Sequence, residues 1–222
     1  MTVDSTSYES VKHLPFAGNQ FPAVVTEPIM FNLAKNGQPV TLLCINDASQ
    51  VPPSLMRVLY REFKYIVDEG LTYPHHVTMD YQGFQEYWFH HFVGVLVEGH
   101  YASVQELPIE ESEQFWDERY LGDFYVKPNY IGRCSHVCNA GFKTHHGKRG
   151  LGLGKELGRK YLEVAPQLGY KYSVFNLVFE TNKASLKIWD DLGFERIGYV
   201  KNAAVLKGHD GFVGAVMFGK DL

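Results

Sequence analysis

Cysteine is scarce in this sequence, and long apolar runs are missing. The 222 residues include only Cys44, Cys134 and Cys138, an odd and small number that does not indicate a disulfide framework, so we expect free thiols in a reducing compartment. No apolar run approaches the ~20 residues that span a bilayer, and the first residues lack the cationic and apolar stretches of a secretory signal. The sequence therefore predicts no membrane partner and a cytoplasmic location, with a mitochondrial pool as the alternative.

An excess of basic charge is also absent. The net charge is −4 at pH 7, so nucleic acid is not an expected partner. Metal-site spacing is missing too: Cys134, His136 and Cys138 would share one face of an extended strand, but no paired C-x-x-C motif accompanies them, and we expect ordinary strand side chains and no metal. The histidine pairs at 75–76, 90–91 and 145–146 are expected on the surface or in packing contacts.

The residues that are present indicate a globular α+β protein. Hydrophobic residues make up 45% and charged residues 21%, which is ordinary, whereas an aromatic content of 14% is high and predicts many rings in a core or along a pocket. Apolar patterns predict strands at 28–33, 39–45, 93–97, 122–126, 134–143, 172–179, 194–200 and 213–219, and helices at 52–69, 84–92, 153–165 and 182–192. Residues 107–118 are acidic and predict a loop with one helical turn. We expect an irregular segment at 1–25 and one domain at 26–222, with a mixed, mostly antiparallel sheet flanked by helices.

A glycine-rich turn precedes the third predicted helix. Five glycines lie from Gly147 to Gly158, and because glycine weakens a helix, this junction requires a reason. Close approach of an anion is one reason, since the first N–H groups of a helix lack internal partners and the helix dipole favours negative charge there. Lys148 and Arg149 would add positive charge at the rim. The turn therefore predicts a diphosphate site, and a tight turn without a ligand is the alternative.

The spacing of the glycines narrows the class of diphosphate. A Walker loop requires a Lys-Ser/Thr pair that does not follow Gly152, and a dinucleotide loop requires a glycine where Leu157 stands. Arg149, Gly152 and Gly154 instead match [Arg/Gln]-x-x-Gly-x-[Gly/Ala], which resembles the pyrophosphate loop of the GNAT N-acetyltransferase superfamily. Residues 182–194, NKASLKIWDDLGF, resemble the second signature of that superfamily and follow in the expected order.

Longer stretches are similar to one subfamily. Residues 124–130, 133–136, 138–142 and 168–179 resemble the fungal L-azetidine-2-carboxylate N-acetyltransferases, and the similarity runs from residue 52 to the C-terminus. The resemblance implies a GNAT-like fold with a parallel, splayed strand pair at the cofactor site, acetyl-CoA as cosubstrate, and a homodimer. It also implies acetylation of a small amino acid, either azetidine-2-carboxylate or glutamate-5-semialdehyde and its cyclic form pyrroline-5-carboxylate, for detoxification or stress tolerance.

The resemblance assigns roles to three asparagines as the catalytic residues. Asn139 and Asn176 are expected to hold the amino acid, beside Trp88 and Phe142, and Asn182 is expected to reach the thioester end of CoA. Amides inside apolar strands need hydrogen-bond partners, although the asparagines could also satisfy each other or the backbone. The predicted cofactor-binding residues are Gly141, Phe142, Lys143, Lys148, Arg149, Gly150, Leu151, Gly152, Leu153, Gly154, Asn182, Ser185 and Trp189.

Two departures from the family pattern leave the mechanism open. Many GNAT enzymes carry a tyrosine as general acid where this chain has Trp189, whose ring nitrogen cannot protonate a thiolate. No obvious general base lies within the predicted strands, and Glu180 is either a base or a solvated strand end. We therefore expect positioning rather than strong acid–base catalysis, with an oxyanion-stabilising N–H near Gly141 and Phe142. A CoA-binding regulatory module and an acetyltransferase for peptide or protein amines are the alternatives.

Overall fold

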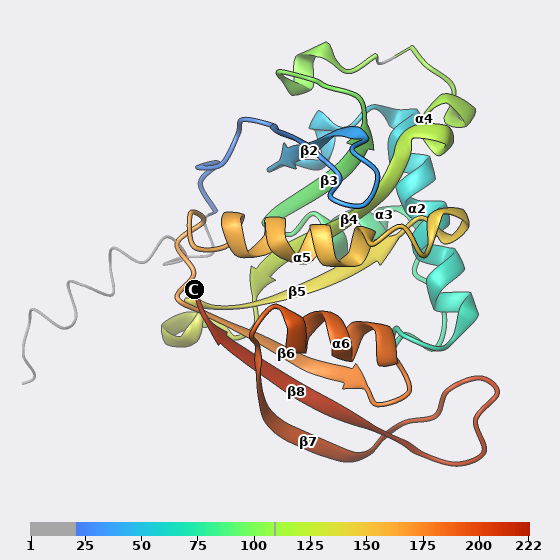
Figure 1. The fold of residues 1–222 in the computed structure, drawn as a ribbon, viewed down its shortest axis with the longest axis vertical. Coiled ribbons are helices and arrows are strands. Elements are labelled where there is room, and N and C mark those ends of the chain that lie inside the picture. The colour runs from blue at the N-terminus through green and yellow to red at the C-terminus, as the bar shows by residue number, and fades with distance from the viewer. Residues whose placement is uncertain (1–20, 109) are drawn as a thin grey trace, which may run out of the picture.

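The computed structural model describes residues 21–108 and 110–222 (Figure 1). Of the irregular segment predicted for residues 1–25, only 21–25 belong to the described part, and they form no helix or strand. The described chain folds into one eight-stranded sheet with five α-helices. The strands are β1 (Ile29–Asn32), β2 (Pro39–Ile45), β3 (Phe92–Glu98), β4 (Tyr120–Pro128), β5 (Val137–Thr144), β6 (Tyr172–Phe179), β7 (Glu195–Ala204) and β8 (Val213–Asp221).

The sheet is mixed and mostly antiparallel, as the sequence predicts. Its strand order is β1-β2-β3-β4-β5-β6-β8-β7, and β5–β6 is the one parallel pair among neighbouring strands of the described chain. This pair has a short ladder, in which Val137 lies opposite Tyr172 and Cys138 opposite Ser173. Beyond Cys138 the two strands separate, and Figure 1 shows β6, β7 and β8 diverging from β5. The sheet therefore opens along one edge of β5.

Helices cover both faces of the sheet. They are α2 (Pro53–Glu69), α3 (Tyr81–Trp88), α4 (Glu113–Arg119), α5 (Leu153–Val164) and α6 (Lys183–Asp191). On one face, Tyr161 of α5 and Trp189 of α6 pack with Phe124 in one apolar core. On the other face, Phe63 of α2 and Trp88 of α3 belong to a second core. The sheet thus divides two hydrophobic cores, which together bury most of the large aromatic side chains.

Local sequence signals explain where the helices begin and end. Pro53 occupies the first turn of α2, and Gly70 ends that helix with a left-handed φ of 71°. The Asp80 side chain accepts a hydrogen bond from the Gly83 N–H as an N-cap, so α3 begins at Tyr81, three residues before the predicted start at Phe84. Among the described residues, every helix falls short of the length or the apolar character that a bilayer span requires.

The structure corrects three boundaries. The acidic segment forms a complete helix, α4, because the Ser112 hydroxyl accepts from the Phe115 N–H as an N-cap. The strand predicted at 134–143 begins only at Val137, since residues 132–134 form a 3₁₀ turn. Cys134 is therefore exposed while Cys138 is buried, and the shared face expected for them does not exist. The helix predicted at 84–92 ends at Trp88, and Phe92 already belongs to β3.

Candidate functional site

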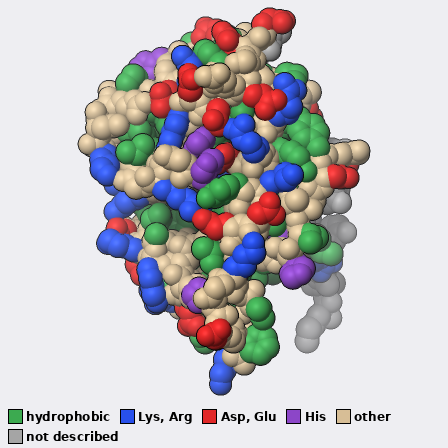
Figure 2. All heavy atoms as spheres, turned by 90° about the vertical axis from the view of Figure 1, so that its right-hand side faces the viewer, with side chains coloured by type: hydrophobic (Ala, Val, Ile, Leu, Met, Phe, Trp, Pro, Cys, Tyr) green, Lys and Arg blue, Asp and Glu red, His purple; other side chains and the backbone are tan. Residues whose placement is uncertain are grey.

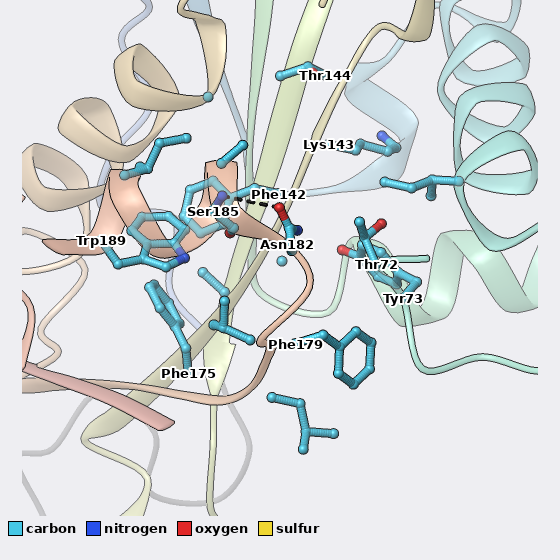
Figure 3. A pocket seen from close by; sticks show the side chains of 18 of the residues that line it. Thr72, Tyr73, Phe142, Lys143, Thr144, Phe175, Phe179, Asn182, Ser185 and Trp189 are labelled. Atoms are coloured by element: carbon cyan, nitrogen blue, oxygen red, sulfur yellow. Dashed lines mark hydrogen bonds between the residues drawn. The ribbon is translucent and has the colours of Figure 1, made fainter. Parts of the chain in front are cut away.

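A cavity of about 1110 Å³ opens where β5 and β6 separate. Its walls come from the segment after α2, the ends of β4 and β5, the glycine-rich turn, and the start of α6. Figure 3 shows Asn182 and Ser185 on one side of this cavity, and Thr72 and Tyr73 across from them. The predicted diphosphate turn and the predicted asparagines therefore line one continuous space.

The glycine-rich turn presents free backbone donors at the start of α5. The N–H groups from Arg149 to Gly154 donate to no other atom of the described residues. Gly150 and Gly152 have φ angles of 84° and 80°, a left-handed conformation that favours glycine, and an added Cβ at either would meet no atom within 4 Å. A row of unpaired N–H groups around open space at a helix N-terminus suits a diphosphate.

The basic side chains beside this turn already have acidic partners. The Arg149 guanidinium donates to both carboxylate oxygens of Glu69, at 2.7 and 3.0 Å. The Lys155 ammonium donates to Asp191 at 2.8 Å, and that of Lys148 lies 3.5 Å from Glu98. Basic and acidic side chains are accordingly interspersed on the face shown in Figure 2. The unpaired hydrogen-bond donors of the turn are therefore its backbone N–H groups, rather than the predicted Lys148 and Arg149 side chains.

Strand β5 divides the cavity into two sides. The Phe142 ring points towards α5 and α6, where its centroid lies 4.8 Å from that of Trp189. Gly141 faces the opposite side, and a Cβ there would come within 2.4 Å of a Tyr125 ring carbon and 2.5 Å of the Tyr73 hydroxyl. Because such contacts are too close for any side chain, glycine is the residue that fits at this position.

The side chain of Lys143 is buried away from the predicted cofactor site. It forms an ion pair with Asp123, and the two side chains are 1% and 0% exposed. Asp123 also accepts hydrogen bonds from Trp88 Nε1 at 3.0 Å and from the Tyr120 hydroxyl at 2.8 Å. Burial lowers the pKa of Lys143 and raises the pKa of Asp123, and their mutual attraction opposes both shifts. Lys143 lines the cavity, but its ammonium group is committed to Asp123.

The same network holds Trp88 outside the cavity. Trp88 has no exposed surface and lies outside the cavity lining, because its indole is committed to Asp123. Successive helix residues point about 100° apart, so the neighbouring Tyr87 lines the cavity instead. Leu151, another predicted contact, packs against the core beside α5 and does not line the cavity either.

A third asparagine joins Asn139 and Asn176, and sequence reasoning missed it. The side-chain oxygen of Asn129 accepts from Asn139 Nδ2 at 3.1 Å and from Asn176 Nδ2 at 2.6 Å. Asn129 Nδ2 in turn donates to Asn176 Oδ1 at 3.2 Å. All three amides line the cavity. Asn129 thus holds the two predicted asparagines, which do not bond to each other, and each of the two keeps hydrogen-bonding capacity that a ligand could use.

The backbone supports this asparagine cluster at two points. Asn129 follows β4, and its N–H donates to the Val137 carbonyl at 2.8 Å, which fixes it beside the start of β5. Asn176 lies where the β6–β8 register shifts, between Phe175 and Val178. Such a bulge turns a side chain away from the regular alternation of a strand. The signal for Asn129 in the sequence is weak, because an asparagine after Lys127-Pro128 is equally typical of an ordinary strand end.

Asn182 has a structural task as well as a place in the cavity. Its side-chain oxygen accepts from the Ser185 N–H at 3.1 Å and so caps α6 (Figure 3). Its side-chain nitrogen donates to no atom of the described residues and remains free for a ligand. Nearby, Trp189 is buried among Phe142, Phe175 and Phe194, so it supports the cavity wall by packing.

Two hydroxyl groups opposite Asn182 lack partners. The Thr72 Oγ1 and Tyr73 hydroxyl oxygens are buried and make no hydrogen bond within the described chain. Burial raises the pKa of Tyr73 well above its usual range, so its hydroxyl stays protonated at neutral pH. Because a buried polar group without a partner is costly, a ligand that bonds to these hydroxyls would be stabilised.

The structure does not place Glu180 as a general base. Its carboxylate accepts from the Gly214 N–H of β8 at 2.8 Å and from the Tyr199 hydroxyl of β7 at 2.9 Å, and it does not line the cavity. These hydrogen bonds lower the pKa of Glu180, which weakens it further as a base. Among the described residues, the carboxylate that does line the cavity is Glu69, and Arg149 binds it.

A histidine cluster lies outside the cavity. Nitrogen atoms of His145 and His146 and an oxygen of Glu62 lie within 4.8 Å of one another. However, His145 Nδ1 accepts from the Gly147 N–H at 3.0 Å, so the proton of the neutral ring lies on Nε2, which faces Asp117 at 3.1 Å. A metal ion at Nε2 would require the opposite tautomer. The ring contacts and hydrogen bonds of this cluster match the packing role expected for these histidines.

The cavity can accommodate acetyl-CoA. Its open glycine turn suits the pyrophosphate, the unpaired edge of β5 offers peptide groups to an extended amide-containing arm, and Asn182 and Tyr73 supply polar atoms without partners.

No model of a known protein family matches the chain. The N-acetyltransferase aca1 of Schizosaccharomyces pombe is 39% identical over 166 residues, which cover 74% of this chain and 78% of that protein.

Solved structures resemble most of the fold. A GCN5-related N-acetyltransferase from Kribbella flavida superposes with a TM-score of 0.66 at 25% identity, over 82% of this chain and 98% of that one. A phosphinothricin acetyltransferase of the GNAT superfamily from Sinorhizobium meliloti, solved in complex with acetyl-CoA, shares the fold with a TM-score of 0.59 at 14% identity, over 82% of this chain and 88% of that one. The chain therefore belongs to the GNAT superfamily and is an acetyl-CoA-dependent N-acetyltransferase.

Proposed function

We propose that this enzyme acetylates the amine of a small amino acid, either azetidine-2-carboxylate or glutamate-5-semialdehyde, the open form of pyrroline-5-carboxylate. The observation that carries the proposal is the cluster of Asn129, Asn139 and Asn176. The cluster lies on the side of β5 that Gly141 faces, which we call the acceptor side. Tyr87 and Tyr125 line the same side of the cavity. Amides and ring faces close together suit a compact, polar acceptor better than an extended peptide.

The proposed role of the asparagines is to orient the acceptor. When bound, acetyl-CoA supplies an acetyl group whose carbonyl carbon is the electrophile. Asn139 and Asn176 would hold the acceptor amine towards it, and Asn129 would hold those two side chains in place. Because amides do not remove protons at neutral pH, the amine proton would leave to water. The protonated Tyr73 hydroxyl, which has no partner within the described chain, would donate a hydrogen bond into the cavity.

A thiol-release assay tests the proposal. Wild-type protein with acetyl-CoA would be supplied separately with azetidine-2-carboxylate, pyrroline-5-carboxylate, a polyamine and a short peptide, and free CoA would be measured. We expect turnover with the small amino acids and an Asn176→Ala variant that loses about 10²–10³-fold in kcat/KM while still folding. The matched control is Asn36→Ala, an exposed residue with local hydrogen bonds only. Turnover confined to the peptide or the polyamine would reject the proposed acceptor class.

A further inference from the structure

Lys127 is the cation on the acceptor side of the cavity. It lies on β4 directly opposite Asn139 of β5, and the same strand face carries the Tyr125–Gly141 pair and the buried Asp123–Lys143 pair. The ammonium group lies 3.7 Å from the ring centroid of Tyr87 and 4.5 Å from that of Tyr125. Lys127 therefore stands beside the asparagine cluster, on the side of β5 that the Phe142 ring does not face.

The neighbours of Lys127 leave its charge uncompensated. Its single hydrogen bond within the described chain goes to the Tyr87 carbonyl at 3.3 Å. The other basic side chains that line the cavity and lie near its walls, Lys143, Lys148, Arg149 and Lys155, each have a carboxylate partner. Lys183 also lacks such a partner, but it is an exposed residue in the first turn of α6. Lys127 is half-buried, and a half-buried cation without a counter-ion favours an anionic ligand.

The aromatic and imidazole groups around Lys127 do not supply that anion. Burial raises the pKa of Tyr73, Tyr87 and Tyr125, so these hydroxyls remain neutral at physiological pH. His75 and His90, the nearby imidazoles, have pKa values lowered by burial and by the charge of Lys127 itself, so they are neutral as well. Ring faces stabilise a cation without neutralising it. The missing negative charge must come from a bound molecule.

The side of the sheet identifies which bound molecule supplies the charge. The phosphate-binding turn belongs to α5, on the face that Phe142 shares with Tyr161 and Trp189. Lys127 projects from the other face, next to the asparagines that face the acceptor. An amino acid carries a carboxylate a few ångströms from its amine, and a peptide N-terminus or a polyamine does not.

From this arrangement we infer that Lys127 binds the carboxylate of the acceptor and so selects free amino acids over amines that lack a carboxylate. The inference rests on the proposed function, because it presupposes an acceptor on this side of β5. Tyr87 and Tyr125 hold the ammonium in place, and Asn139 and Asn176 hold the amine end of the same molecule. The pocket then binds both the amine and the carboxylate of a zwitterionic amino acid.

The test removes each half of the contact in turn. Wild type and Lys127→Met would be assayed with azetidine-2-carboxylate and with its carboxamide, which keeps the ring and the amine but has no carboxylate. We expect wild type to favour the acid by about 10- to 100-fold in kcat/KM. In Lys127→Met we expect kcat/KM to fall far more for the acid than for the amide, so that the preference is lost. Lys127→Arg, which keeps the charge, should retain most of the preference. The matched control, Lys183→Met, should leave the acid-to-amide ratio unchanged.

The outcomes separate the inference from the proposed function. Equal loss of activity on acid and amide in Lys127→Met would mean that the lysine acts on the amine or on folding, and the inference would be overturned. An unchanged ratio would overturn it too. If Lys127→Met fails to fold, as judged by circular dichroism, the Arg variant and the wild-type preference for acid over amide still decide the question. Failure of the proposed function shows earlier, as wild-type protein that releases no CoA with any small amino acid.

Discussion

Gly152→Ala tests whether the glycine-rich turn holds the phosphates of acetyl-CoA. Gly152 has a φ of 80° and caps α5 at its N-terminus. Open space surrounds the position that a Cβ would occupy, so the methyl group collides with nothing in the protein. Any loss of acetyl-CoA affinity would therefore come from the methyl group or from re-aimed N–H groups, and not from damaged packing.

The expected magnitude has two separate parts. A non-glycine residue in the left-handed conformation costs ~1–2 kcal/mol, which should appear as a lower free energy of unfolding. A hydrogen bond to a charged group contributes ~1.5–3 kcal/mol, so one lost N–H contact to a phosphate should raise the Kd for acetyl-CoA about 10- to 100-fold. The first effect acts on stability and the second on binding.

Gly208→Ala is the matched control, since it separates the two effects. Gly208 lies between β7 and β8 with a φ of 70°, and a Cβ there also meets no atom within 4 Å. Both variants should lose similar stability in urea titrations, whereas calorimetry with acetyl-CoA should show weaker binding for Gly152→Ala alone. If Gly152→Ala binds acetyl-CoA as tightly as Gly208→Ala does, the turn is not the phosphate site.

Three further predictions concern the acceptor side of β5. Asn129→Ala removes the oxygen that accepts hydrogen bonds from Asn139 and Asn176, so kcat/KM should fall about 10- to 100-fold while calorimetry shows unchanged acetyl-CoA affinity. A weaker acetyl-CoA affinity would mean that Asn129 acts on the cofactor and not on the acceptor. Lys143→Met strands a buried carboxylate on Asp123 and should cost ~3–5 kcal/mol of unfolding free energy in urea, and a cost below ~1 kcal/mol would contradict the buried pair. Burial lowers the pKa of Lys127 from 10.5 to about 8, so its positive charge is present below that pH and is lost above it. N-acetyl-azetidine-2-carboxylate has no titrating amine and can serve as an inhibitor. In wild type its inhibition constant should be independent of pH below pH 8 and should rise about tenfold per pH unit above it. In Lys127→Met the inhibition constant should not change with pH.

Much of the fold follows from local signals in the sequence. The continuous apolar run of β6 and the periodic face of α5 predict their elements within one or two residues, because each is specified by its own side chains. α4 required one more signal, the hydroxyl of Ser112 as an N-cap, which outweighs the acidic composition of the segment. The start of β5 depends on where β6 lies beside it, and that is a tertiary contact which no local pattern encodes.

The site can be predicted from the sequence only where the residues that form it are neighbours along the chain. The glycine-rich turn is contiguous, so its glycines and the helix that follows are visible together in the sequence. Asn139 lies in β5, Asn176 lies in β6 and Asn129 follows β4, so only the geometry shows that Asn129 holds the other two. Whether Tyr87 or Trp88 lines the cavity depends on which face of α3 meets it. Trp88 faces away, because its indole N–H donates a hydrogen bond to the buried carboxylate of Asp123.

The alternation along β5 gives one strand two tasks. Phe142 points to the aromatic core beneath the cofactor turn, while Asn139 and Gly141 point to the acceptor side. The absence of a side chain at Gly141 lets Tyr73 and Tyr125 approach the strand closely, so the two sides meet there without an intervening side chain. Substitutions at the glycine turn should therefore change acetyl-CoA affinity without changing acceptor preference, and substitutions around Lys127 should do the reverse. A variant on one side that altered both properties equally would mean that the two substrates share a single, undivided site.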